Sequence, residues 1–156
     1  MITQRFKELG IALPETPAPI ASYVPASRTR NLMFVSGQIP MVDGKLIATG
    51  KVPNEVDLET AKRCARQCVL NGLAAAADHL GKSGAAELDQ ITAVAHVCCY
   101  VSCDPSFTDH SLVANGASEL LQDIFGERGK HSRIAVGAAS LPMNSPVEIS
   151  MILSIR

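Results

Sequence analysis

Residues 147–155 narrow the possible folds of this chain more than any other stretch, because their side chains alternate with a period of two. Successive side chains of an extended chain point to opposite faces, so this alternation predicts a β-strand buried on one face only. One face carries Val147, Ile149, Met151, Leu153 and Ile155, and the other carries Glu148, Ser150, Ile152 and Ser154. The stretch is therefore predicted to be a half-buried strand that holds a carboxylate.

A second alternating stretch lies shortly before the first, at residues 132–138. One of its faces holds Ile134, Val136 and Ala138, and the opposite face holds Arg133, Ala135 and Gly137. Residues 140–146, SLPMNSP, interrupt both alternations with two prolines, which indicates a connecting loop. We expect both strands in one sheet, with Arg133 and Glu148 on the face turned away from the covering helices.

A cation and a carboxylate on one face of a sheet allow two interpretations. Arg133 and Glu148 form either a salt-bridged surface pair or the floor of a site for a small anionic molecule. Their spacing is compatible with both.

Length and charge exclude several classes of protein. The 156 residues predict one domain, large enough to bury a substantial core. The formal net charge is -1, and no run of basic residues is longer than a pair, so an electrostatic nucleic-acid interface is not expected. No apolar run approaches the roughly 18 residues of a membrane-spanning helix, and the first residues lack the apolar core of a signal peptide. We therefore expect a cytoplasmic protein without a membrane partner.

The five cysteines do not indicate a disulfide framework, because they are odd in number and fall in predicted helices and strands. Cys64 and Cys68 are one helical turn apart, which would suit two metal ligands, but no second ligand pair follows at zinc-site spacing. We expect small buried thiols.

The first half of the chain is predicted to supply a short helix and two strands. Ile2, Phe6 and Leu9 lie on one side of a short amphipathic helix. A proline-rich passage follows, in which residues 20–24 are compatible with an edge strand. Residues 31–36 form a compact apolar run, which predicts a strand buried on both faces.

Two longer helices are marked by residues that cap helix ends. Asp57 is a suitable N-cap for the first, which is predicted to end at Gly81. Either Ser106 or Asp109 can cap the second, which is predicted to end at Gly126.

Asn115 stands beside Gly116 inside this second helix, and neither residue favours a helical backbone. We interpret the pair as a sign that the backbone or the amide of Asn115 has another role.

The strand predicted at residues 91–101 has no face polar enough for open water. One face holds Ile91, Ala93, Ala95, Val97, Cys99 and Val101, and the other holds Thr92, Val94, His96, Cys98 and Tyr100. The two helices can cover one side of the sheet only. We expect another copy of the same chain to cover the other side.

Four separated motifs, taken together, resemble one known family. They are Tyr23 in IASYV, residues 35–40 with the sequence VSGQIP, Asn115 ahead of ELLQDIFG, and Arg133 fifteen residues before Glu148 in SR-x-A-V…LP…VEI. In order and spacing they resemble the Rid family of reactive-intermediate imine deaminases, also called YjgF or L-PSP endoribonuclease-like proteins.

The resemblance implies a chorismate-mutase-like α+β domain, in which a mixed β-sheet packs two helices on one face. It also implies a homotrimer with ligand sites in the clefts between subunits. Residues 1–156 would form a single domain, with residues 1–19 as an N-terminal extension.

The resemblance further implies which residues form the site. Arg133 and Glu148 match the positions that carry catalysis, with Arg133 also binding the substrate carboxylate. The matching substrate-binding positions are Tyr23, Ser36, Gly37, Asn115 and, through its backbone carbonyl, Ala135. No metal or cofactor is implied, because imines hydrolyse in water and need only positioning and electrostatic stabilisation.

The implied activity is hydrolysis of 2-aminoacrylate-type enamines and 2-imino acids to 2-keto acids and ammonia. The alternative is a non-catalytic trimeric module that binds a small 2-imino or 2-keto carboxylate. This chain departs from the family pattern around its arginine, since Ala135 replaces a frequent cysteine and His131-Ser132 replaces Pro-Ala. A cysteine thiol is therefore excluded as an obligatory participant.

Overall fold

The computed structural model describes residues 1–16, 22–81 and 84–156. Its helices and strands follow in this order: α1 (Ile2–Glu8), β1 (Ala26–Thr29), β2 (Leu32–Gln38), β3 (Met41–Val42), β4 (Lys45–Leu46), α2 (Leu58–Leu80), β5 (Ile91–Ser102), α3 (His110–Phe125), β6 (Ser132–Ala138) and β7 (Val147–Ile155). Three short 3-10 segments, η1 (Gly84–Gln90), η2 (Gly126–Gly129) and η3 (Pro142–Asn144), connect some of them. No helix in the described ranges is both long and apolar enough to span a membrane.

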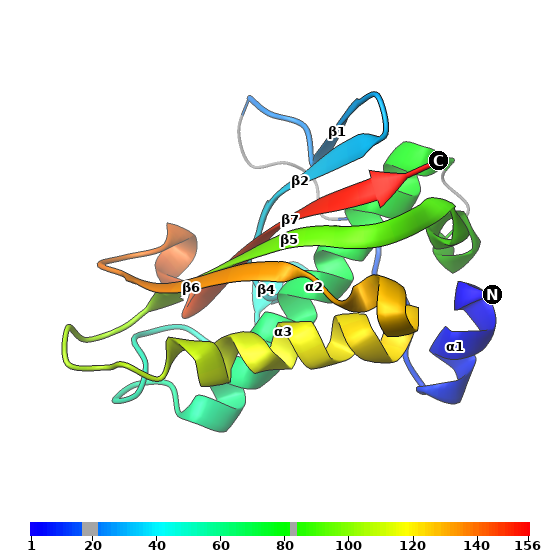
Figure 1. Cartoon of the computed structure of the whole chain (residues 1–156). Helices are drawn as coiled ribbons and strands as arrows, with labels where there is room; N and C mark the ends of the chain where they lie inside the picture. The colour runs from blue at the N-terminus through cyan, green and yellow to red at the C-terminus, as the bar shows by residue number, and fades with distance from the viewer. Residues whose placement is uncertain (17–21, 82–83) are drawn as a thin grey trace.

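The five-stranded sheet has the order β1-β2-β7-β5-β6, and α2 and α3 pack side by side against one of its faces (Figure 1). Strands β5 and β6 are parallel, whereas β1, β2, β7 and β5 pair with antiparallel neighbours. Strands β3 and β4 form a separate small ribbon. The expected α+β fold, with a mixed sheet and two helices on one face, is confirmed. The two alternating stretches lie in one sheet as expected, but β5 separates β6 from β7.

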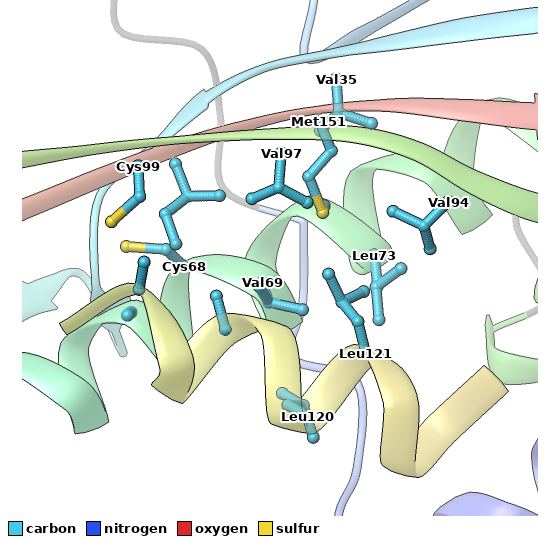
Figure 2. Packing of buried hydrophobic residues seen from close by; sticks show 14 of the residues in the cluster. Val35, Cys68, Val69, Leu73, Val94, Val97, Cys99, Leu120, Leu121 and Met151 are labelled. Carbon is cyan, nitrogen blue, oxygen red and sulfur yellow. The ribbon is translucent and has the colours of Figure 1, made fainter. Parts of the chain in front are cut away.

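The core lies between the sheet and the two helices. Figure 2 shows Val97 and Met151 of the sheet directed at Leu73 of α2 and Leu121 of α3. Every second residue of β7 is buried, as the period of two predicts. Residues of α2 at the contact are mostly small, which lets the helix lie close to the strands.

The predicted helix ends are confirmed. The sequence could indicate them because each depends on contacts within a few residues. The Asp57 side chain accepts a hydrogen bond from the Thr60 backbone N–H at 2.8 Å, and Gly81 and Gly126 are the C-caps of α2 and α3. Asp109, not Ser106, is the N-cap of α3.

The N-terminal segment also behaves as expected. Ile2 and Phe6 are buried, and helix α1 packs against η1 and α3. The backbone N–H of Ile2 donates to the carboxylate of Asp89 at 2.8 Å, which fixes the start of the helix.

Two predictions for the first strands are wrong. The edge strand is β1, at Ala26–Thr29, and residues 22–24 are in no strand; residues 20–21 lie outside the described residues. Strand β2 is buried on one face only, because Phe34 is 41% exposed while its neighbours Met33 and Val35 are buried.

The predicted alternation of β5 fails near its start. The pairing of β5 with β7 shifts between Ile91 and Ala93 and again between Val94 and His96. Each extra residue reverses the alternation that follows it. Val94 is therefore 2% exposed among core residues, whereas the uninterrupted pattern places it on the opposite face.

Among the described residues, nothing covers the face of the sheet opposite the helices, and this face is partly apolar. Phe34 on β2, Tyr100 on β5 and Ile134 on β6 are exposed by 41%, 37% and 45%. We call this surface the open face. It is the face for which a second copy of the chain is expected.

Candidate functional site

Arg133 and Glu148 lie on opposite faces of the sheet, so the expectation that they share one face is wrong. Strand β5 lies between them and sets the register. Val97 pairs with both Arg133 and Met151 on the helix side, whereas Tyr100 pairs with Glu148 on the open face. Alternation within β6 and within β7 is correct, but it cannot reveal how one strand is aligned with the other.

The guanidinium of Arg133 is held by helix α3. Its Nη1 donates to Asn115 Oδ1 at 2.9 Å and to Ser118 Oγ at 3.0 Å, and its Nη2 donates to the Ser111 carbonyl at 3.4 Å. All of these acceptors are uncharged. The contact with Asn115 explains why an amide stands in the middle of this helix.

Ser118 and His131 extend this hydrogen-bonded group, and sequence reasoning missed both as site residues. Ser118 Oγ lies 2.9 Å from His131 Nε2, and His131 Nδ1 lies 2.6 Å from the Gly129 carbonyl oxygen. Two spacings could have found them: Ser118 is one helical turn after Asn115, and His131 is two residues before Arg133.

An open recess of about 530 Å³ lies beside this group, between α3 and the start of β6. Its lining is polar and consists of Asn115, Ser118, Glu119, Gln122, Lys130, His131 and Arg133. The volume is in the range of small-ligand sites.

Ala135 follows Arg133 on the same face of β6, opposite Cys99 of β5, and packs at the edge of the core. Because β6 is the last strand of the sheet, the Ala135 backbone stands at an edge. The predicted residues Arg133, Asn115 and Ala135 are thus brought together, and we call them, with Ser118 and His131, the arginine group.

Glu148 belongs to a second group on the open face. The pairing of β2 with β7 shifts between Val35 and Gln38, and Gly37 in this irregular segment lies directly against the Glu148 carboxylate. A β-carbon at residue 37 would overlap that carboxylate, so a larger residue there would push the end of the Glu148 side chain aside. Burial raises the pKa of Glu148 above its ordinary value.

Ser36, the neighbour of Gly37 in β2, belongs to this second group. The Ser36 hydroxyl donates to the Val24 carbonyl at 2.7 Å, which ties β2 to the segment that carries Tyr23. Tyr23 is 44% exposed and belongs to no strand. We call Gly37, Ser36 and Glu148 the glutamate group; the predicted site residues therefore separate into two groups within one chain.

The cysteines lie elsewhere. All but the half-buried Cys98 are buried, as expected. Burial raises the pKa of Cys64 to about 11 and that of Cys99 to about 12, so both are thiols at neutral pH. Across the described ranges, no three His, Cys, Asp or Glu side chains are placed to hold a metal ion.

Comparison with known proteins identifies relatives along the whole chain. A family profile described as "YjgF/chorismate mutase-like, putative endoribonuclease" matches residues 3–154. Protein TCP17 of Trypanosoma cruzi is 34% identical over 156 residues, which cover 99% of this chain and 94% of the relative.

Solved structures agree. A protein of unknown function from Agrobacterium tumefaciens is 42% identical, with a TM-score of 0.88 over 99% of this chain and 91% of its own. A putative endoribonuclease from Shewanella oneidensis is 28% identical, with a TM-score of 0.92 over 99% of both chains. The chain therefore belongs to the YjgF/chorismate mutase-like family, to which its separated motifs already pointed.

Proposed function

We propose that the protein hydrolyses small 2-imino acids and their enamine tautomers to 2-keto acids and ammonia, in a site that two copies of the chain form together. Membership of the family supports this class of reaction. In the proposed site, Arg133 of one copy binds the substrate carboxylate and Glu148 of the next copy guides the attacking water. The observation that carries the proposal is that the Arg133 guanidinium is held by uncharged oxygens and has no counter-ion within the described residues.

That guanidinium is oriented but not neutralised. Within the described residues its partners are the uncharged oxygens of α3, and no ion pair includes it. A guanidinium carries five N–H donors, and these contacts leave some of them for a ligand. A half-buried cation without a counter-ion favours an anion, and a carboxylate matches the planar fork of arginine.

The placement of the two groups supports a site between copies. The arginine group lies at the β6 edge on the helix side, whereas Glu148 lies on the open face. One copy therefore directs its two charged groups away from each other. A second copy that packs its open face against the β6 edge of the first would bring its Glu148 to Arg133. The exposed apolar residues of the open face favour such packing.

The chemistry needs one water and one proton carrier. The water oxygen bonds to the imine carbon while Glu148 takes one of its protons. The C=N π bond breaks as this proton is delivered to the nitrogen, which gives a carbinolamine. Glu148 then takes the remaining hydroxyl proton and passes it to the amino nitrogen, so that the C–N bond breaks, ammonia leaves and a C=O bond forms. Burial raises the pKa of Glu148, which suits a group that must hold a proton between two steps near neutral pH.

The test generates a 2-imino acid with an amino-acid oxidase and follows its loss in the presence of the purified protein. We expect wild type to accelerate the loss and Arg133→Ala to lower kcat/KM by about 100-fold or more, because charge-assisted hydrogen bonds contribute about 1.5–3 kcal/mol each. Arg63→Ala is the matched control, since Arg63 is exposed on α2 and its side chain contacts Thr60. Wild-type activity in Arg133→Ala would remove Arg133 from the mechanism.

Two other outcomes have distinct signatures. Thermal stabilisation by a 2-keto acid without turnover would identify the binding module instead of the enzyme. The family description also names an endoribonuclease, so RNA cleavage is measured on the same preparation. The net charge of -1 favours the small-molecule substrate.

A further inference from the structure

A chain of hydrogen bonds connects Arg133 to His131 through Ser118. We propose that Ser118 and His131 are positioning residues that hold the Arg133 guanidinium for carboxylate binding, and that protonation of His131 tightens this binding. The inference rests on the proposed function and assigns roles to two residues beyond it. His131-Ser132 stands where members of the resembling family often have Pro-Ala, so a role for the His131 ring is not one that the resemblance implies.

The direction of each hydrogen bond follows from its fixed end. The Gly129 carbonyl can only accept, so His131 Nδ1, 2.6 Å away, carries a hydrogen. In the neutral ring, Nε2 is then an acceptor and receives the hydroxyl hydrogen of Ser118 at 2.9 Å. The lone pairs of Ser118 Oγ are thereby left to accept from Arg133 Nη1 at 3.0 Å.

Because Ser118 is buried, the loss of its hydrogen bonds should be costly. Ser118 is 7% exposed, and a buried hydroxyl that loses its partners costs free energy. Asn115 and Ser118 are one helical turn apart and both bind Nη1, so together they determine the direction in which the guanidinium faces. Removal of Ser118 Oγ would leave Nη1 with Asn115 alone in this pair.

Protonation of His131 would change the recess in two ways. Nε2 would become a donor to Ser118 Oγ, which frees the hydroxyl hydrogen to turn toward a bound anion. The ring would also add a positive charge beside Arg133, in the recess where the carboxylate is expected. Both changes favour an anion.

The charged surroundings of His131 come from several elements. Arg133 on β6 and His96 on β5 disfavour its protonation, and Lys130 and Glu119, the latter on α3, line the same recess. Burial is the main reason why the pKa of His131 lies below its ordinary value, so the ring is neutral at pH 7.5 and is protonated only in more acid solution. A bound carboxylate would raise that pKa.

The experiment is a calorimetric titration of the full chain with pyruvate, a stable 2-keto acid, at about pH 7.5 and about pH 5.5. The proteins are wild type, Arg133→Ala, Ser118→Ala, His131→Ala and His131→Gln, with His79→Gln as control because His79 is exposed at the end of α2. Thermal denaturation of each variant reports whether it is folded. His131→Gln keeps a donor and an acceptor on its amide but cannot titrate.

We expect Arg133→Ala to abolish binding, and Ser118→Ala and His131→Ala to weaken it about tenfold, the size of one lost hydrogen bond to a charged group. Wild type and His79→Gln should bind pyruvate about threefold or more tightly at the lower pH, as one added charge several ångströms away predicts. His131→Gln should show no such gain. A merely structural role would not move this pH dependence.

Other outcomes distinguish failure of the positioning proposal from failure of the proposed function. If Arg133→Ala abolishes binding while folded Ser118→Ala and His131→Ala bind as wild type does, the positioning role is wrong and the carboxylate anchor stands. If His131→Gln keeps the wild-type pH dependence, another group such as Glu148 titrates, and the role given to protonation is wrong. If wild type does not bind pyruvate, or Arg133→Ala binds it equally, the proposed function itself is wrong.

Discussion

Gly37 lies so close to Glu148 that a β-carbon at residue 37 would overlap the carboxylate. The contact is made across two adjacent strands, β2 and β7, at the point where their pairing is irregular. It fixes the carboxylate against a backbone and not against another flexible side chain. The proposed function needs this, because a proton carrier must stay within hydrogen-bond reach of its substrate.

Gly37→Ala should therefore displace the carboxylate and reduce imine hydrolysis, with a loss of stability of about 1 kcal/mol because the flexible end of Glu148 can move aside. Chemical denaturation gives the stability, and the oxidase-coupled reaction gives the activity. The matched control is the double variant Gly37→Ala with Glu148→Ala. It should recover most of the stability lost by Gly37→Ala, because the overlapping group is gone. A double variant no more stable than Gly37→Ala would mean that the carboxylate is not the cause.

Replacement of Glu148 by Gln should alter how stability depends on pH. Burial raises the pKa of Glu148, so the folded protein binds its proton more tightly than the unfolded chain does. The free energy of unfolding therefore falls as pH rises from about 4.5 through the folded-state pKa. Glu148→Gln lacks this loss.

The difference in Tm between Glu148→Gln and wild type should accordingly grow in favour of the variant between pH 4.5 and pH 7.5. Thermal denaturation at both pH values checks it, and the variant should also lose imine hydrolysis. An equal difference at the two pH values would contradict the assigned pKa shift.

The features of this fold that the sequence predicted correctly are local. Asp57 caps α2 by a contact three residues away, and Gly126 ends α3 through its own conformation, with φ of 60°. The alternation of β7 needs only the pleat of one strand. Such interactions can be recognised without knowledge of what lies elsewhere in the chain.

The relation between Arg133 and Glu148 is not local, and the sequence could not settle it. It depends on which residues of β5 pair with Arg133 and with Glu148. The pairing of β5 with β7 is irregular at two points that the sequence pattern does not predict. The bond from Ser118 to His131 likewise requires α3 to pack beside the start of β6. Motif resemblance supplied Arg133 and Asn115 as site residues, but not their direct hydrogen bond.

Gly116 should tolerate no side chain, although alanine is the better helix former by about 1 kcal/mol. A β-carbon at residue 116 would overlap the backbone carbonyl of Lys62, where α3 crosses α2. Gly116→Ala should therefore destabilise the protein by about 1–3 kcal/mol in chemical denaturation. Lys62→Ala should not rescue it, because the overlapping atom belongs to the backbone. A stabilised Gly116→Ala would show that helix propensity outweighs the contact.

The placement of Arg133 and Glu148 on opposite faces predicts how two inactive variants behave together. If Arg133 of one copy and Glu148 of the next share a site, Arg133→Ala and Glu148→Ala should each be inactive alone. Co-expressed in equal amounts, they assemble at random, and one site in about four receives both natural residues, since each is present with a chance of one half. About a quarter of wild-type activity should return.

The control for this experiment mixes two finished preparations without allowing exchange of subunits, which should restore no activity.

A second control co-expresses Arg133→Ala with Asn115→Ala. Both changes lie in the arginine group, and Asn115 Oδ1 accepts from Arg133 within one chain. In that pair, every copy carries a defect in its own arginine group. Because these two residues bond within one chain, a natural arginine group is present only on copies that carry neither change, and none is made. Recovery with Glu148→Ala but not with Asn115→Ala would therefore place Arg133 and Glu148 in different copies of a shared site, and the absence of any recovery would contradict a site that two copies form together.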